Sequence, residues 1–199
     1  EVEALFGYEF RKKNATHAYE PIVAGGENAC TLHYIKNNAK LRKHSPVLID
    51  IGARYGMYCA DITRTYIVEP TKRQQEVHNA LTEVQRLTID LISPGLAVLD
   101  YMNESDRLMK EALVKLNLIS SVDDNEGFRT YMPHSVSHGL GIDVHDSLGK
   151  PRFFETGMVL TVEPGIYITD EKIGMRLEDD ILVTSSGRKN LSAKLSTGW

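Results

Sequence analysis

Apolar residues recur at helical spacing in three stretches of the chain. The first is residues 1–13, which no capping residue precedes, so the chain is expected to begin inside a helix and to be a fragment. A longer helix is expected from about residue 72 to 92, because Thr71 and Gln74 form a capping box ahead of apolar residues spaced three and four apart. A Ser-Pro-Gly run ends it. A third amphipathic helix is expected over 99–116.

Runs rich in β-branched and aromatic residues predict strands elsewhere. Residues 47–51 and 57–68 are expected to pair as a hairpin with Tyr55-Gly56 at its tip. Strand character returns in three later stretches, 134–144, 158–163 and 174–184. The order of helix, hairpin, two helices and then strands predicts an α+β fold rather than alternating βαβ units.

Composition excludes several classes of protein. With 199 residues, 42% of them hydrophobic and 25% charged, the chain is typical of one globular domain. Its net charge of -4 gives no broad basic surface, so no nucleic-acid or membrane partner is expected. There is no apolar run of about 18 residues and no secretory pattern at the amino end, which favours a cytoplasmic location. Cys30 and Cys59 are expected to be free thiols.

Two aspartates stand in the predicted hairpin. If the tip is Tyr55-Gly56, Asp50 and Asp61 lie directly opposite each other on one face. Like charges in that position are destabilising, so a positive group is expected between them. The simpler interpretation is that one of them is a turn residue or forms an ion pair with Arg54 or Arg64.

A histidine cluster follows the helical part of the chain. His134, His138 and His145 are three of its seven histidines. His134 and His138 have the spacing of a helical zinc pair, but Pro133 and two following glycines argue against a helix, and no Glu follows His134. A single histidine here would be explained by a structural hydrogen bond. Three together favour a site.

Two glutamates interrupt apolar strands near the carboxyl end. Glu163 could simply end a strand at a Pro-Gly turn, and Glu178 could pair with Arg176, which strand alternation places on the same face. Together with the two aspartates and one imidazole they form an oxygen-rich set that suits Mn, Co or Zn. Four carboxylates balance the charge of two divalent ions, which predicts a dinuclear centre.

Five separated motifs resemble the M24 "pita-bread" metallopeptidases, in the branch of aminopeptidase P and prolidase. The motifs lie at 32–34, 48–65, 134–146, 157–167 and 174–180. The resemblance implies a pita-bread (creatinase/aminopeptidase-like) α+β fold, with a curved antiparallel sheet flanked by helices. It also implies that residues 1–199 are a single catalytic domain, truncated at the amino end and without the N-terminal creatinase-like domain.

The resemblance further implies the metal ligands. Asp50 would chelate one ion, and Asp61 and Glu178 would bridge the pair. His138 and Glu163 would complete the site of the second ion. The implied cofactors are two divalent ions, Mn(II) in the first place, with Co(II) or Zn(II) as alternatives.

Catalytic roles also follow from the resemblance. His33, His134 and His145 would line the substrate site, and His33 and His145 could donate hydrogen bonds to the substrate carbonyl. Glu163 would carry the proton to the leaving nitrogen. Arg176 would orient the bridging Glu178.

The implied activity is that of an Xaa-Pro aminopeptidase, a hydrolase that acts through a water bridging two metal ions on a peptide with proline at the second position. The resemblance is also compatible with a homodimer. One alternative is an Xaa-Pro dipeptidase (prolidase), which must bind the free carboxylate of its substrate, with Lys150 and Arg152 as the nearest basic candidates. The others are a non-catalytic pita-bread module that binds peptides or proteins, and a structural domain whose acids form ion pairs.

Overall fold

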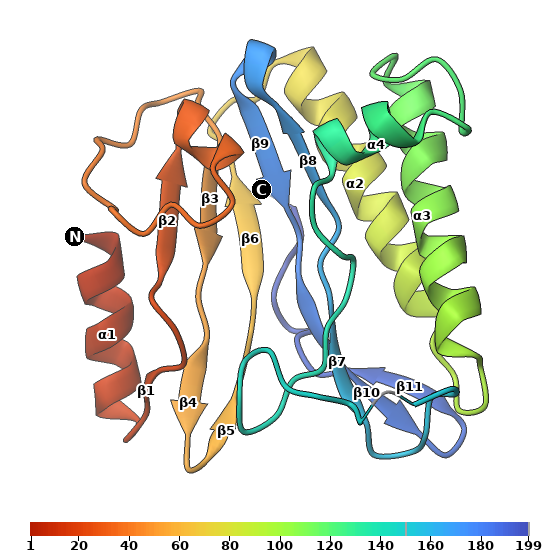
Figure 1. Ribbon diagram of the computed structural model, residues 1–199. Helices are drawn as coiled ribbons and strands as arrows, with labels where there is room; N and C mark the ends of the chain where they lie inside the picture. Colours follow the sequence, from red (N-terminus) through yellow and green to blue (C-terminus); the bar gives the residue numbers. More distant parts are fainter. Residues whose placement is uncertain (150, 199) are drawn as a thin grey trace.

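A row of strands crosses the molecule and is flanked by helices on either side (Figure 1). The computed structural model describes residues 1–149 and 151–198. The helices are α1 (Val2–Lys12), α2 (Lys72–Leu91), α3 (Val98–Lys115) and α4 (Asn125–Tyr131), with two short 3-10 helices, η1 (Gly26–Cys30) and η2 (Thr169–Glu171). The strands are β1 (Thr16–His17), β2 (Ile22–Gly25), β3 (Val47–Asp50), β4 (Ala53–Tyr55), β5 (Tyr58–Cys59), β6 (Thr63–Tyr66), β7 (Val159–Val162), β8 (Gly165–Ile168), β9 (Ile173–Arg176), β10 (Asp179–Thr184) and β11 (Gly187–Asn190).

The three helices predicted from periodicity are present. In α2 the capping box forms as expected: the Thr71 side chain accepts from the Gln74 backbone, and the Gln74 side chain accepts from the backbone of Thr71. The unexpected helix α4 is only one or two turns long, too short for a periodic pattern, and is capped by Asp124, which accepts from the Gly127 N–H.

The hairpin forms, but its predicted register is wrong. Asp50 pairs with Thr63 rather than with Asp61, because the turn is centred one residue later, on Gly56-Met57. Gly56 takes a positive φ of 60° at the first turn position, which favours glycine there. Asp61 is therefore the diagonal neighbour of Asp50 on the same face, and the two carboxylates are not directly opposed.

Two other strand predictions need correction. Residues 134–144 run antiparallel to β7, through backbone hydrogen bonds that include Glu163 N–H to Val136 O and Thr161 N–H to His138 O, but they form no regular strand. The ladder is incomplete because the His138 N–H donates to the Thr161 hydroxyl instead of to a carbonyl. The stretch 174–184 is not one strand but two, because β9 pairs with β8 and β10 pairs with β7.

The main core lies between α2 and α3 and the strands β7 to β10, and its buried residues include Leu81, Met109 and Leu160. A smaller cluster lies under β2, β3 and η1. The neighbouring strands β6 and β9 (Figure 1) are joined by the Thr65 hydroxyl, which donates to the Arg176 carbonyl and accepts from the Arg176 N–H. Among the described residues, no helix combines the length and apolar character of a membrane span.

Candidate functional site

The four predicted carboxylate ligands all lie where a strand ends or is interrupted. Asp50 is the last residue of β3, and Asp61 lies between β5 and β6. Glu163 separates β7 from β8, and Glu178 separates β9 from β10. All four line one cavity of about 690 Å³. The breaks in the strands thus bring acidic side chains from distant parts of the sequence to one place.

Tyr19 connects the two aspartates. Its hydroxyl lies 2.5 Å from Oδ1 of Asp50 and 2.6 Å from Oδ1 of Asp61. The ring can come this close because Gly52 has no side chain: a Cβ there would lie 2.8 Å from Cε1 of Tyr19 and 1.7 Å from the Ala60 carbonyl oxygen. A hydroxyl carries one proton, so only one of its two short contacts can be a bond that it donates. The other contact requires a proton on a carboxyl group.

Glu178 is held by Thr63, which is also a partner of Arg176. The Thr63 hydroxyl donates to Oε2 of Glu178 over 2.7 Å and accepts from Nε of Arg176 over 3.1 Å. Arg176 then donates through Nη2 to Oδ2 of Asp50 over 2.5 Å. The simple ion pair of Arg176 with Glu178 is therefore not what the structure shows: the paired carboxylate is Asp50. The guanidinium contacts Asp50 directly and is linked to Glu178 through the Thr63 hydroxyl.

His138 directs its free nitrogen at two carboxylates. Nδ1 lies 3.0 Å from the Gly139 carbonyl, so it must carry the proton, and Nε2 is the unprotonated nitrogen of a neutral ring. Burial lowers the pKa of His138 and keeps the ring neutral. Nε2 lies 3.2 Å from Oε1 of Glu163 and 3.5 Å from Oδ2 of Asp61. A lone pair that faces two carboxylates is an arrangement that a cation would satisfy.

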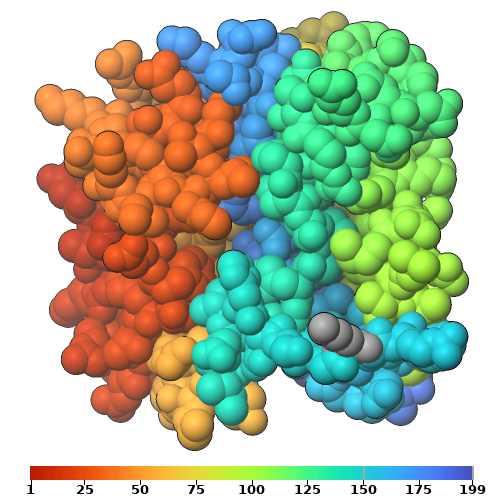
Figure 2. All heavy atoms as spheres, in the orientation of Figure 1, coloured from red at the N-terminus to blue at the C-terminus, as the bar shows by residue number. Residues whose placement is uncertain are grey.

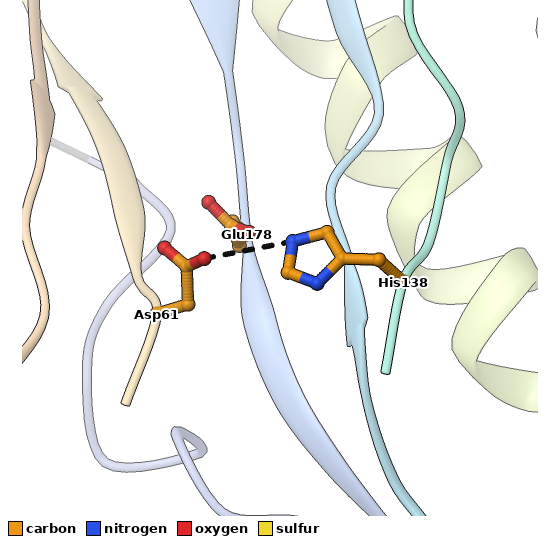
Figure 3. Close-up of side chains that lie close together, drawn as sticks. All are labelled: Asp61, His138 and Glu178. Carbon is orange, nitrogen blue, oxygen red and sulfur yellow. Dashed lines mark ion pairs between the residues drawn. The ribbon is translucent and has the colours of Figure 1, made fainter. Parts of the chain in front are cut away.

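Three of the side chains form a group that suits a metal ion. Asp61, His138 and Glu178 each offer one ligand atom, and these atoms all lie within 4.8 Å of one another. Figure 3 shows the three side chains pointing toward one another from separate elements, with the contact of Asp61 and His138 dashed. The two oxygens of Asp61 face different groups, Oδ1 toward Tyr19 and Oδ2 toward His138.

The charges in this cluster do not balance. Five carboxylates line the cavity, four of them in this cluster and the fifth that of Glu20, and the one guanidinium that the described residues place in its wall belongs to Arg176. Burial, with the nearby acids adding to it, raises the pKa of Asp61 to about 7. Burial also raises the pKa of Glu163 to about 8, and that of Glu178, which is 1% exposed, well above its ordinary value. In the absence of a cation, the raised pKa values mean that the carboxyl groups retain protons more readily, which reduces the excess negative charge. A donor set of carboxylates and one imidazole fits divalent cations.

His134 is the end of a hydrogen-bonded chain. Arg176 Nη1 donates to the Tyr167 hydroxyl over 2.7 Å, and that hydroxyl lies 2.9 Å from Nε2 of His134. Nδ1 of His134 donates to the Ser135 carbonyl over 2.8 Å. Burial lowers the pKa of His134 to about 4, so the ring is neutral and accepts the Tyr167 proton.

The two remaining histidines are exposed at the cavity. His33 follows η1 on one wall, and His145 lies on the other, where its ring contacts the edge of His138 with centroids 4.4 Å apart. In Figure 2 the orange surface that contains residues 19–35 and the green to cyan surface of residues 130–149 face each other across a hollow. All the predicted site residues, whether assigned to metal or to catalysis, line this one cavity.

The alternative ion pairs do not form. Arg64 pairs with Asp179, with Nη2 2.6 Å from Oδ1, and Arg54 donates to the Ile142 carbonyl. Cys30 and Cys59 are both free. Of the two basic residues considered for a substrate carboxylate, Lys150 lies outside the described residues, and Arg152 is exposed and is not part of the cavity wall.

Sequence reasoning missed three uncharged residues that hold the site. Thr63 and Tyr167 stand inside motifs that were recognised, but their neutral hydroxyls gave no reason to single them out. Tyr19 lies outside every motif. Its position depends on the approach of the loop to Gly52, which has no signature in the sequence.

Comparison with known proteins agrees with this geometry. The sequence model of metallopeptidase family M24 matches residues 1–185. The Xaa-Pro aminopeptidase of Escherichia coli K12 is 38% identical over 98% of this chain, which covers 48% of the relative. Xaa-Pro aminopeptidase 3 of Homo sapiens is 38% identical, with 96% of this chain and 41% of the relative covered.

A solved structure is similar as well. That of aminopeptidase P from Escherichia coli with the inhibitor Pro-Leu aligns with a TM-score of 0.88 at 38% identity, covering 98% of this chain and 49% of the other. The likeness establishes the fold that the motifs predicted. The chain spans about half the length of these relatives.

Proposed function

Because the chain belongs to metallopeptidase family M24, we propose that it carries the catalytic site of a metal-dependent Xaa-Pro aminopeptidase, a hydrolase that removes the first residue of peptides with proline in second position. The observation that carries the proposal is the meeting of Asp61, His138 and Glu178, with ligand atoms within 4.8 Å of one another, at an acidic cavity. Relatives named Xaa-Pro aminopeptidase support the choice of substrate.

We assign five residues to two divalent ions: Asp50, Asp61, His138, Glu163 and Glu178. The two oxygens of Asp61 face different groups, Oδ1 the Tyr19 hydroxyl and Oδ2 the His138 ring, which supports a bridging role for this residue. Glu178 is the second bridging candidate. Manganese as the metal, a homodimer and a cytoplasmic location stay predictions. When bound, such ions lower the pKa of a water molecule toward neutrality and polarise the substrate carbonyl.

The chain's own residues then perform the remaining steps. Glu163, a carboxylate beside His138 at the edge of the cluster, can carry a proton to the leaving prolyl nitrogen. His33 and His145, exposed on opposite walls, can donate hydrogen bonds to the carbonyl oxygen as its charge grows. Arg176 holds Asp50 directly and Glu178 through Thr63, which fixes the positions of both carboxylates.

The charges of the cavity wall favour an aminopeptidase over a dipeptidase. A dipeptidase must bind the free carboxylate of its substrate, and the wall formed by the described residues has no lysine and only one arginine, Arg176, which is already paired with Asp50. The wall has instead an exposed carboxylate, that of Glu20. We therefore expect tripeptides and longer peptides to be better substrates than Xaa-Pro dipeptides.

The test compares release of the first residue from Leu-Pro-Leu and from Leu-Pro, with Mn(II) and with chelator. We expect cleavage of the tripeptide that depends on added metal. Faster cleavage of the dipeptide would favour the prolidase alternative. Stoichiometric metal binding without cleavage of either peptide would refute the peptidase proposal and favour a binding module.

A further inference from the structure

Glu20 is a carboxylate in the cavity that neither the metal cluster nor the chemistry uses. It is exposed, it lines the cavity, and it has no hydrogen bond or ion pair with any described residue. The exposed basic residue Lys36 lies on the same stretch of chain but does not line the cavity. Glu20 is thus available to a cation that enters from solution.

The backbone on both sides of Glu20 is fixed. Tyr19 is held through its hydroxyl at Asp50 and Asp61. Pro21 is held by Asn37, whose Nδ2 donates to the Pro21 carbonyl over 2.7 Å and whose Oδ1 accepts from the Val23 N–H. A charge on a fixed backbone loses little conformational freedom when it pairs with a ligand, which favours selective binding.

Part of the wall of the cavity that Glu20 lines is apolar. Ile22, Leu32 and Ile35 line the same cavity, and Leu32 packs against the cluster that contains Ile22. Such a wall with a carboxylate near it suits a side chain that has an aliphatic stem and a cationic end, because lysine and arginine bury their methylene groups while their charge stays in water.

We propose that Glu20 determines substrate specificity by pairing with the cationic side chain of a lysine or arginine in the peptide. This rests on the proposed function, since it concerns the peptide that the same site would cleave. The substrate class is then basic peptides with proline in second position.

The experiment measures kcat/KM for Leu-Pro-Leu, Arg-Pro-Leu and Leu-Pro-Arg, with the wild-type chain and Glu20→Gln. An exposed ion pair contributes modestly, so we expect a preference of about two- to fivefold for at least one arginine peptide, removed by Glu20→Gln. The arginine peptide that shows the preference identifies whether Glu20 binds the first or the third residue of the substrate. Glu27→Gln is the matched control, because Glu27 is exposed in the same part of the chain, pairs with Lys172 and does not line this cavity; it should leave the preference unchanged.

Charge reversal gives a second readout. We expect Glu20→Lys to turn the preference toward the peptide with glutamate at the position that arginine occupied. Equal losses for all three peptides in Glu20→Gln would mean that the carboxylate binds the shared α-ammonium group, and would overturn the proposal, as would an unchanged preference.

The two proposals can fail separately. If the wild-type chain cleaves none of the peptides, the proposed function fails, and the role of Glu20 is decided by calorimetric Kd values for the same peptides. Tighter binding of an arginine peptide that Glu20→Gln abolishes supports the role. If the Kd of each arginine peptide is the same in the wild-type chain and in Glu20→Gln, the role of Glu20 is refuted.

Discussion

Replacing Thr63 with valine tests whether Glu178 is a metal ligand that the Thr63 hydroxyl holds in position. The change keeps the shape of the side chain and removes the hydroxyl that donates to Oε2 of Glu178 over 2.7 Å. Thr63 is fully buried, so water cannot replace the lost donor. Loss of a partner that orients a metal ligand typically weakens metal binding about 10- to 100-fold. That factor corresponds to about 1.4 to 2.8 kcal/mol.

The metal-free chain loses stability through two hydrogen bonds. Thr63→Val removes the donor to Glu178, whose pKa burial raises, and also the acceptor of the buried Arg176 Nε–H. Losing these bonds costs about 1 to 3 kcal/mol. We therefore expect a loss of stability in urea with chelator present, and in addition a loss of Mn(II) affinity by calorimetry.

Thr65→Val is the matched control. Thr65 is also a buried threonine of β6, but its hydroxyl bonds to the backbone of Arg176 rather than to a carboxylate. It should cost about the same stability, about 1 to 3 kcal/mol, with little change in metal affinity. Unchanged Mn(II) affinity in Thr63→Val, or equal losses of affinity in both variants, would refute the reasoning.

Three further outcomes are expected. Asp61→Ala and Glu178→Ala should each abolish binding of the metal pair, measured by metal analysis after gel filtration, and retention of two ions would contradict the bridging assignment. Because the pKa values of Asp61 and Glu163 are raised to about 7 and about 8, the folded metal-free chain holds protons that the unfolded chain has released, so its stability should fall as pH rises from about 6.5 to about 8, where histidines are largely neutral in the folded and unfolded chain; urea midpoints in chelator that rise over this range would contradict the charge imbalance. Gly174→Ala would place a Cβ 2.1 Å from the Ala29 carbonyl oxygen, so β9 and η1 must separate, and we expect a loss of about 1 to 3 kcal/mol in thermal or urea unfolding.

The sequence predicts the helices better than the strands, for a physical reason. The repeat of α2 extends over many residues and carries its own capping box, so local information is enough. The strands are short and broken, and some of them pair across long stretches of chain, as β1 does with β4 and β2 with β3. The hairpin register depends on which residues form the turn. Because the predicted turn was one residue too early, Asp50 was expected to pair with Asp61, whereas its partner in the structure is Thr63.

The site was predictable where chemistry alone identifies a residue. Acidic side chains in apolar strands are costly unless something compensates them, so they stand out one at a time, as do three histidines close together in a glycine-containing segment. Tyr19 and Thr63 do not, because a tyrosine or a threonine is ordinary in a loop or a strand. Their roles arise only when Gly52 lets the Tyr19 ring approach and when β6 lies beside β9.

The breaks in the strands and the ligand cluster depend on each other, because the same hydrogen bonds serve both. Where the ladder stops, the Asp61 N–H donates to the Asp180 carboxylate and the His138 N–H to the Thr161 hydroxyl. The Glu178 N–H donates to the Thr63 carbonyl across the two halves of the row of strands. A buried N–H that lost its partner would cost about as much as a hydrogen bond. Asp61, His138 and Glu178 are therefore each placed by a bond that the fold also requires. The acidic cluster, whose carboxylates repel one another without a cation, is held together by the strands that it interrupts.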